Sequence, residues 1–273
     1  MDRPPNRPEP AAPRLRALRR PLDSFNSLLG LARSLVIYRR PGRRRGLRRL
    51  YGPFVGRGDL VFDIGAHVGD RTAAFASLGA RVVALEPQPR IAGWLRRLVG
   101  GTPGVTVVEA AVGREPGSAR LAVSARTPTV STLSDSWKRR MGEGNPGFRD
   151  VRWETAVDVR VTTLDALIGE HGVPRFCKID VEGFEAEILE GLSHPVPALS
   201  FEFVRGGLDV ARRCVARLRS LGDYEYNVVE GEERAFRLAG WRSADQIDTW
   251  LAAGADDLAS GDLYARTTVR EER

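Results

Sequence analysis

Apolar residues recur with two different periods along the chain, and the period changes near residue 58. Before that point they are spaced three or four residues apart, which predicts helices, with breaks around Pro21 and at Pro41. After it, short apolar runs alternate with helical segments, and the pattern predicts strands at 60–64, 81–85 and 105–108. Strand–helix alternation is typical of βαβ units, so we expect a doubly wound, mostly parallel α/β sheet.

The alternation pauses after the third strand. Two further strands are expected at 119–124 and 155–161. The polar stretch at 125–150 between them has a length that is typical of a functional lid or of a disordered segment. The alternation then resumes, with strands expected at 175–180, 198–203, 224–229 and 263–266. From these patterns we expect three parts: a disordered tail (1–13), a basic helical extension (14–56) and an α/β domain (57–273).

Positive charge is concentrated at the start of the chain. The net charge is +7, but residues 1–50 carry 14 Arg against three acids, a balance of +11, which leaves −4 for the remainder. A nucleic-acid-binding domain would be more uniformly basic. We expect the Arg-rich arm to be a solvated helical face, or else a contact for anionic lipid, nucleic acid or acidic glycan. A weak peripheral membrane contact is thus one interpretation, and we infer no firm nucleic-acid partner.

Cysteine content and hydropathy indicate the compartment. Cys177 and Cys214 are the two cysteines, and their spacing suits neither a disulfide framework nor a zinc site. No apolar run approaches the about 18 residues of a transmembrane helix, and the N-terminus lacks the features of a secretory signal. We therefore expect a cytoplasmic protein; no pattern indicates its oligomeric state.

The first strand ends in a glycine-containing loop of the form D-x-G-x-x-x-G. Asp63, Gly65 and Gly69 carry this pattern, and Glu86 ends the next strand, 21 residues after Gly65. An acid at that place accepts hydrogen bonds from ribose hydroxyls, whereas the glycine pattern of diphosphate-binding folds is missing. A cationic nucleoside without phosphate fits, so we predict S-adenosylmethionine as cofactor; an ordinary turn beside a surface acid is the alternative. The candidate cofactor-binding residues are Asp63, Gly65, Ala66, His67, Gly69, Glu86, Pro87, Glu109, Ala110 and Asp180.

The segment at 176–185 carries the strongest chemical signal. Strand alternation places Lys178 and Asp180 on one side of a central strand, with Glu182 just beyond it. Charges this deep in a sheet are costly unless they are paired or form a site. An acid-rich helix start would explain Glu182 and Glu185, but it would not explain Lys178.

Several segments, in order, resemble the FkbM family of S-adenosylmethionine-dependent methyltransferases. They cover about residues 58–205, and the most specific are D-I-G-A-x-x-G and K-I-D-V-E-G-x-E. The other matching segments are A-L-E-P-Q-P (84–89), A-V-G (111–113), T-L-D (163–165), I-L-E-G (188–191) and S-F-E-F (200–203). The resemblance implies a class I, Rossmann-like methyltransferase fold with a seven-stranded sheet. It also implies methyl transfer to a hydroxyl of a sugar, glycolipid or polyketide-type product.

The resemblance also implies roles for individual residues. Asp63, Gly65 and Gly69 match the cofactor loop and Glu86 the ribose-binding acid, while Lys178, Asp180 and Glu182 match a block beside the transferred methyl. Ser131 and Thr132 fall where relatives have a hydroxyl-rich segment near the pocket. Phe184 departs from the small residue that is frequent there.

Methyl transfer to a hydroxyl needs alignment and a base. Asp180 is the first candidate base, with Lys178 orienting it or holding the acceptor, and His67 is the second candidate. Glu182 completes the candidate catalytic set. Asp180, Glu182 and Glu202 could also hold a divalent metal, but no ligand spacing requires one, and we predict none.

Three other functions stay open at this point. One is a nucleic-acid methyltransferase that uses the Arg-rich arm, although no base-flipping motif of the Asn-Pro-Pro-Tyr type is present. The second is a nicotinamide-dependent oxidoreductase, which the missing diphosphate pattern disfavours. The third is a catalytically inactive scaffold that binds the cofactor; Asp63, Glu86 and Asp180 count against it.

Overall fold

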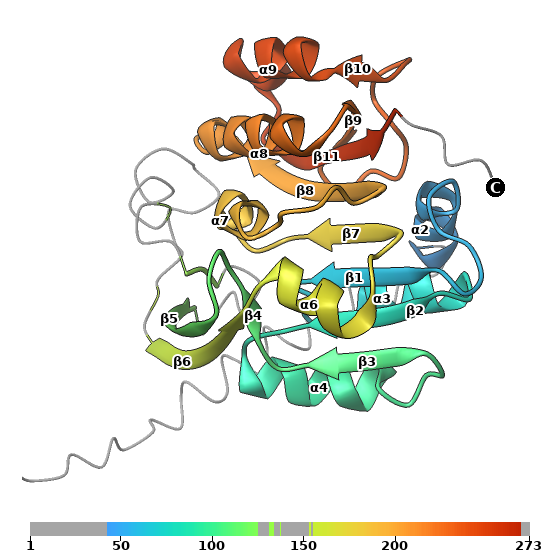
Figure 1. Ribbon diagram of the computed structural model, residues 1–273, viewed down its shortest axis with the longest axis vertical. Coiled ribbons are helices and arrows are strands. Elements are labelled where there is room, and N and C mark those ends of the chain that lie inside the picture. The colour runs from blue at the N-terminus through green and yellow to red at the C-terminus, as the bar shows by residue number, and fades with distance from the viewer. Residues whose placement is uncertain (1–42, 125–130, 134–136, 138–152, 154, 269–273) are drawn as a thin grey trace, which may run out of the picture.

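Figure 1 shows a computed structural model of the protein, which describes residues 43–124, 131–133, 137, 153 and 155–268. The tail expected at 1–13, most of the basic extension and most of the 125–150 loop lie outside the described residues.

A mostly parallel sheet forms the centre of the molecule, as the alternating pattern predicts. Its strands lie in the order β10 (Arg242–Ser243), β9 (Tyr224–Glu230), β11 (Ser260–Thr267), β8 (Ala198–Val204), β7 (Phe176–Ile179), β1 (Leu60–Ile64), β2 (Arg81–Leu85) and β3 (Val105–Val108). Strands β8, β7, β1, β2 and β3 pair in parallel, and β11 runs antiparallel between β8 and β9. The seven strands expected for the main sheet are thus present, and the two-residue β10 is added at one edge.

A second, smaller sheet stands beside the main one. It consists of β4 (Ala111–Val112), β6 (Thr155–Thr162) and β5 (Gly117–Val123). The strands expected at 119–124 and 155–161 therefore exist, but they leave the main sheet and pair antiparallel with each other.

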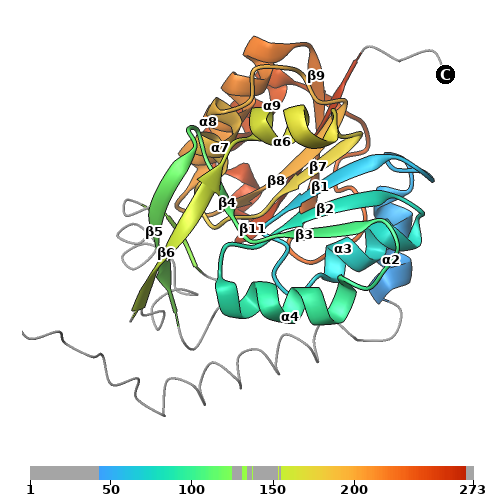
Figure 2. The same ribbon diagram turned by 60° about the horizontal axis from the view of Figure 1, so that its bottom comes forward.

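Helices cover both faces of the main sheet (Figure 2). One face carries α2 (Arg43–Tyr51), α3 (Asp70–Ser77) and α4 (Pro89–Val99), and the other carries α6 (Leu164–His171), α7 (Glu185–Glu190), α8 (Leu208–Leu221) and α9 (Ala244–Ala252). A short 3₁₀ helix, η3 (Ala255–Asp257), precedes β11.

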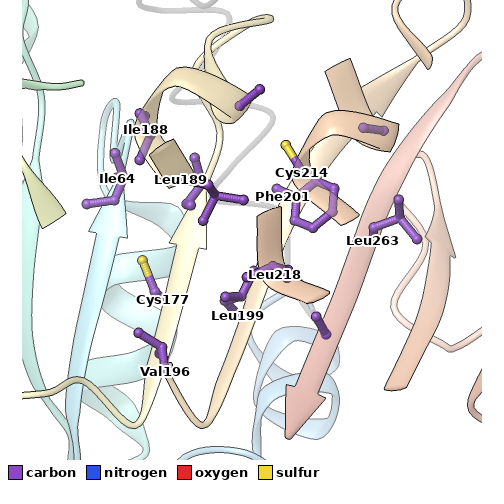
Figure 3. Close-up of a cluster of buried hydrophobic side chains, with 14 of the residues drawn as sticks. Ile64, Cys177, Ile188, Leu189, Val196, Leu199, Phe201, Cys214, Leu218 and Leu263 are labelled. Atoms are coloured by element: carbon purple, nitrogen blue, oxygen red, sulfur yellow. The ribbon is translucent and has the colours of Figure 1, made fainter. Parts of the chain in front are cut away.

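Strand alternation assigns side chains to two cores. Figure 3 shows one of them, where the strand residues Ile64, Cys177, Leu199 and Phe201 face α7 and α8. Each is at most 1% exposed. Burying an apolar side chain of this size contributes about 1.5–3 kcal/mol, so this layer holds the strand ends, and the residues that follow them, in fixed positions.

The described end of the basic extension packs into the other core. Leu47, Leu50 and Tyr51 of α2 are buried, and the Tyr51 ring lies 4.4 Å from the Phe75 ring and 5.5 Å from the Phe176 ring. The arginines on the opposite side of α2 are exposed. None of the helices in the described part of the chain is long and apolar enough to cross a bilayer.

Candidate active site

A cavity of about 260 Å³ opens at the carboxyl ends of the central strands. Ligands bind at this edge in open α/β sheets. Its walls come from the loops after β1, β2, β3 and β7, from β8 and from the small sheet. The lining residues are Ile64, Gly65, His67, Arg71, Glu86, Pro87, Gln88, Ala110, Ala111, Val112, Leu121, Ser131, Leu133, Asp180, Val181, Glu182, Phe184, Glu202 and Glu232.

Glu86 lies at the β2 end of this cavity, held by the loop that follows β1. Its two carboxylate oxygens accept backbone N–H groups of His67 at 3.1 Å and of Gln88 at 2.9 Å. The side chain is 3% exposed, and burial raises its pKa to about 7 although these N–H groups act in the opposite direction. Glu86 is thus a fixed acceptor whose charge is poorly solvated, which suits a ligand that donates hydrogen bonds to it.

Gly65 lets the loop after β1 touch the loop after β7. Its φ is +79°, and a Cβ at this position would lie 1.9 Å from the carbonyl oxygen of Asp180. No side chain fits there without moving the backbone that carries Asp180. The glycine therefore places the candidate base directly beside the cofactor loop.

Replacing Gly65 by alanine is expected to lower the melting temperature and to displace Asp180. The left-handed backbone alone costs about 1–2 kcal/mol for an alanine, and the clash adds to it. Gly58→Ala is the matched control, because Gly58 has a φ of +85° and nothing within 4 Å of its Cβ position. Thermal unfolding of both variants checks this; equal losses would show that the contact with Asp180 is unimportant.

A row of polar residues crosses the main sheet beneath the cavity. Asp63 pairs in register with Lys178, and Lys178 with Ser200. Lys178 is 1% exposed, and its Nζ donates to Oδ2 of Asp180 at 2.6 Å, so both lie on one side of the sheet, as strand alternation predicts. The hydroxyl of Thr72 donates to Asp63 at 2.5 Å. The deep charges are therefore paired and hydrogen-bonded, which such burial requires.

Opposite charges keep Asp180 and Lys178 ionised. Burial raises the pKa of Asp180, but the neighbouring Lys178 and Arg71 outweigh it, and the net shift is downward. Burial lowers the pKa of Lys178, and the carboxylates of Asp180 and Asp262 outweigh that effect and raise it. His67 behaves differently: burial lowers its pKa to about 4, so its imidazole is neutral at pH 7.

Three carboxylates converge at the end of the cavity that lies opposite Glu86. Oxygens of Asp180, Glu182 and Glu202 lie within 4.8 Å of one another. Burial, and then the neighbouring carboxylates, raise the pKa of both glutamates well above the usual range. Carboxyl groups this close disfavour each other's ionisation and share protons. That no metal is needed remains a prediction.

The small sheet and residues 131–133 form one wall of the cavity, next to these carboxylates. Leu121, Ser131 and Leu133 line the cavity, and the hydroxyl of Thr132 donates to the carbonyl of Glu182 at 2.8 Å. Ser131 thus lines the cavity, and Thr132 contacts the turn that carries Glu182 without being one of the lining residues. A Cβ on Gly183 would lie 2.2 Å from the Trp137 ring. This indole, 2% exposed, therefore packs directly on the turn that carries Glu182.

Not every predicted site residue lines the main cavity. Ala66, Asp63 and Lys178 line a separate cavity of about 30 Å³ below it and support the loop from beneath. Gly69 packs α3 against Leu95 of α4. The Glu109 carboxylate pairs with Arg96 at 2.9 Å on the surface, so the structure gives it no place among the lining residues.

Sequence reasoning missed two charged residues that line the cavity. Arg71 lies in the first turn of α3 and Glu232 in the segment after β9. The one available signal for Arg71 was its position directly after the glycine loop. Glu232 carried none, because its place in the cavity depends on how β9 lies in the sheet.

Comparison with known proteins identifies the family. The Methyltransferase FkbM domain matches residues 63–256, which is more than half of the chain. The chain belongs to the FkbM methyltransferase family. The cavity thus lies in a methyltransferase domain, and its position at the carboxyl edge of the sheet agrees with the class I methyltransferase fold.

One curated protein that the chain resembles is the hexuronic acid methyltransferase AglP of Haloferax volcanii. It is 26% identical over 164 residues, which cover 59% of this chain and 62% of that protein. The match thus spans less than two thirds of the relative's length.

Solved structures of similar fold are more distant. One is a TehB-like S-adenosylmethionine-dependent methyltransferase of Corynebacterium glutamicum, with a TM-score of 0.44 and 12% identity over 91% of this chain and 100% of that one. Another is an O-methyltransferase of Bacillus cereus in complex with S-adenosylhomocysteine, with a TM-score of 0.43 and 14% identity over 93% and 94% of the two chains.

Proposed function

We propose that this protein transfers a methyl group from S-adenosylmethionine to a hydroxyl of a sugar-type acceptor. The observation that carries the proposal is the distribution of groups in the cavity. Glu86, a buried carboxylate suited to accept hydrogen bonds from ribose hydroxyls, lies at one end, and the ionised carboxylate of Asp180 lies at the other. The similarity to a hexuronic acid methyltransferase supports a sugar acceptor, including one with a carboxylate of its own.

The residues present fit this cofactor. Glu86 already accepts two backbone N–H groups, and its oxygens have further lone pairs for ribose hydroxyls. Ala110, Ala111 and Val112 offer an apolar wall of short side chains for the adenine ring of the cofactor. The carboxylates at the other end suit a ligand with positive charge. When bound, the cofactor supplies an electrophilic methyl group on a sulfonium.

The chain supplies alignment and a proton acceptor. With the cofactor bound, the acceptor oxygen would take the methyl group from the sulfonium sulfur, so that an O–C bond would replace the S–C bond and the acceptor hydroxyl would give up its proton. Asp180 is the proposed base: Lys178 holds one oxygen at 2.6 Å, and the carboxylate lines the cavity. Glu182 and Glu202 lie close enough to Asp180 to receive this proton when they are ionised, and their raised pKa values then favour the transfer. Neutral His67 forms part of the cofactor wall.

The test is methyl transfer from labelled S-adenosylmethionine to a panel of acceptors. The panel contains neutral sugars, uronic acids and a polyketide alcohol, with an RNA transcript as the competing class. We expect a methyl ether on a sugar or uronic acid and release of S-adenosylhomocysteine. Label transferred to RNA alone, or cofactor binding without transfer to any alcohol, would contradict the proposal.

A further inference from the structure

Arg71 is a buried cation in the cavity that the proposed mechanism does not use. Its side chain is 17% exposed, and it lines both the main cavity and the small one beneath it. Burial lowers its pKa, but Tyr51 and the carboxylates of Glu232 and Asp180 outweigh this and raise it. The guanidinium is therefore charged at every pH at which the protein is folded.

The hydrogen-bonding capacity of this guanidinium is not filled by the described part of the chain. Its two terminal nitrogens have ion pairs to Asp70 at 3.8 Å and to Glu232 at 3.7 Å, both well beyond the about 2.7–2.9 Å of a charge-assisted hydrogen bond. Its Nε is buried, with no hydrogen-bond partner among the described residues. A buried donor set in this condition is costly unless a ligand satisfies it.

The charges around Arg71 restrict the ligand. Glu86, Asp180, Glu182, Glu202 and Glu232 all line the same cavity. A simple anion would meet these acids and be disfavoured. A ligand that carries one carboxylate together with positive groups would satisfy both Arg71 and the acids.

The position of Arg71 relative to Glu86 points to the same ligand. Glu86 follows β2, Asp180 follows β7, and β1 lies between these two strands, so their ends are separated by about 10 Å along the edge of the sheet. Arg71 lies in the helix that follows β1. Arg71 thus lines the cavity from the helix after the strand between these two ends, where it could contact the amino-acid portion of a nucleoside whose ribose lies at Glu86.

We propose that Arg71 is a carboxylate-binding residue and that it binds the α-carboxylate of the methionine portion of S-adenosylmethionine. This assignment rests on the proposed function. The ammonium and sulfonium of the same ligand then face the carboxylates, of which Asp180 is held ionised by Lys178. The arginine thus fixes the amino-acid end of the ligand, as Glu86 fixes the ribose end, and the methyl between them acquires a defined direction.

The test compares two ligands that differ in this carboxylate alone. Calorimetry measures binding of S-adenosylmethionine and of its decarboxylated analogue to the full chain, to Arg71→Met and to Arg71→Lys. We expect the wild type to prefer the carboxylated ligand roughly 10- to 100-fold, Arg71→Met to lose that preference, and Arg71→Lys to keep part of it. Equal affinity of wild type and Arg71→Met for the decarboxylated analogue reports an intact site. Arg81→Met, an exposed arginine at the opposite end of β2, is the matched control.

A second arm separates the cofactor carboxylate from an acceptor carboxylate. Binding of methyl glucuronide and of methyl glucoside is measured on the complex with S-adenosylhomocysteine. Loss of glucuronide binding in Arg71→Met with unchanged cofactor affinity would overturn the assignment to the cofactor. Unchanged cofactor preference in Arg71→Met with no acceptor effect would overturn the carboxylate site itself. Failure of the wild type to bind any of the nucleosides would overturn the proposed function together with it.

Discussion

Asp180→Asn is expected to lower kcat for methyl transfer by about two to four orders of magnitude, the usual contribution of a positioned base. Asparagine keeps the size and the acceptor oxygen that faces Lys178, but it cannot take the proton of the acceptor hydroxyl. Binding of S-adenosylhomocysteine, which lacks the sulfonium charge, is expected to change little. Single-turnover kinetics and calorimetry on the same preparation measure the two effects.

The control for this variant removes the second half of the ion pair. Asp180→Asn leaves Lys178, which is 1% exposed, without its 2.6 Å partner. Breaking a fully buried pair costs up to about 3–5 kcal/mol, and a smaller loss is expected here because Asp180 is 33% exposed. The double variant Lys178→Met/Asp180→Asn removes the unpaired charge, so its melting temperature should recover while kcat stays low. If kcat recovers with stability, Asp180 has a structural role and the base lies elsewhere.

Glu86→Gln is expected to change both stability and cofactor affinity, each with its own pH dependence. The pKa of Glu86 is about 7 in the folded protein, against 4.5 as its ordinary value. The folded state therefore binds this proton more tightly than the unfolded state, and the wild type loses stability as pH rises from 4.5 through 7. Since glutamine does not ionise, its stability relative to wild type should improve by about 2–3 kcal/mol between about pH 5 and pH 8.

The same substitution is expected to weaken binding of the cofactor. Ribose hydroxyls donate to a carboxylate more strongly than to an amide, so affinity for S-adenosylhomocysteine should fall roughly 10- to 100-fold. Wild-type affinity should rise with pH through 7 as Glu86 ionises, and the affinity of the variant should stay flat. Denaturant unfolding and calorimetry across this range measure both. Glu115→Gln, at a side chain 82% exposed, should change neither, and a parallel change in that control would trace the effect to overall charge.

Local pattern predicted the central strands because they are short apolar runs buried along their length, and it predicted the helices because each carries an apolar stripe. The strand pairings of the small sheet were not predictable in this way. Strands β5 and β6 have the same alternation as an edge strand of the main sheet, and their partner is decided by non-local contacts, such as those that bury Leu121 and Val159.

The site was predicted where spacing alone brings residues together. Lys178 lies on β7 and Asp180 directly follows that strand, two residues later, so alternation continued by one residue sufficed to pair them. Arg71 was missed because helix α3 could have turned it to solvent, and its direction is set by packing against α2. The 2.2 Å approach of the Gly183 Cβ position to Trp137 was equally hidden, since these residues are 46 positions apart in the sequence.

The small sheet is joined to the rest of the protein in a way that lets the two sheets change in sequence independently. Its strands β5 and β6 pair with each other and with the two-residue β4, and in the described part of the chain they share no hydrogen-bonded ladder with the main sheet. Insertions or deletions at their far end leave the register of the cofactor-binding strands intact. If the small sheet recognises the acceptor, as its place at the cavity suggests, the acceptor can change through this module while Glu86, Gly65 and Asp180 keep the positions that the main sheet gives them.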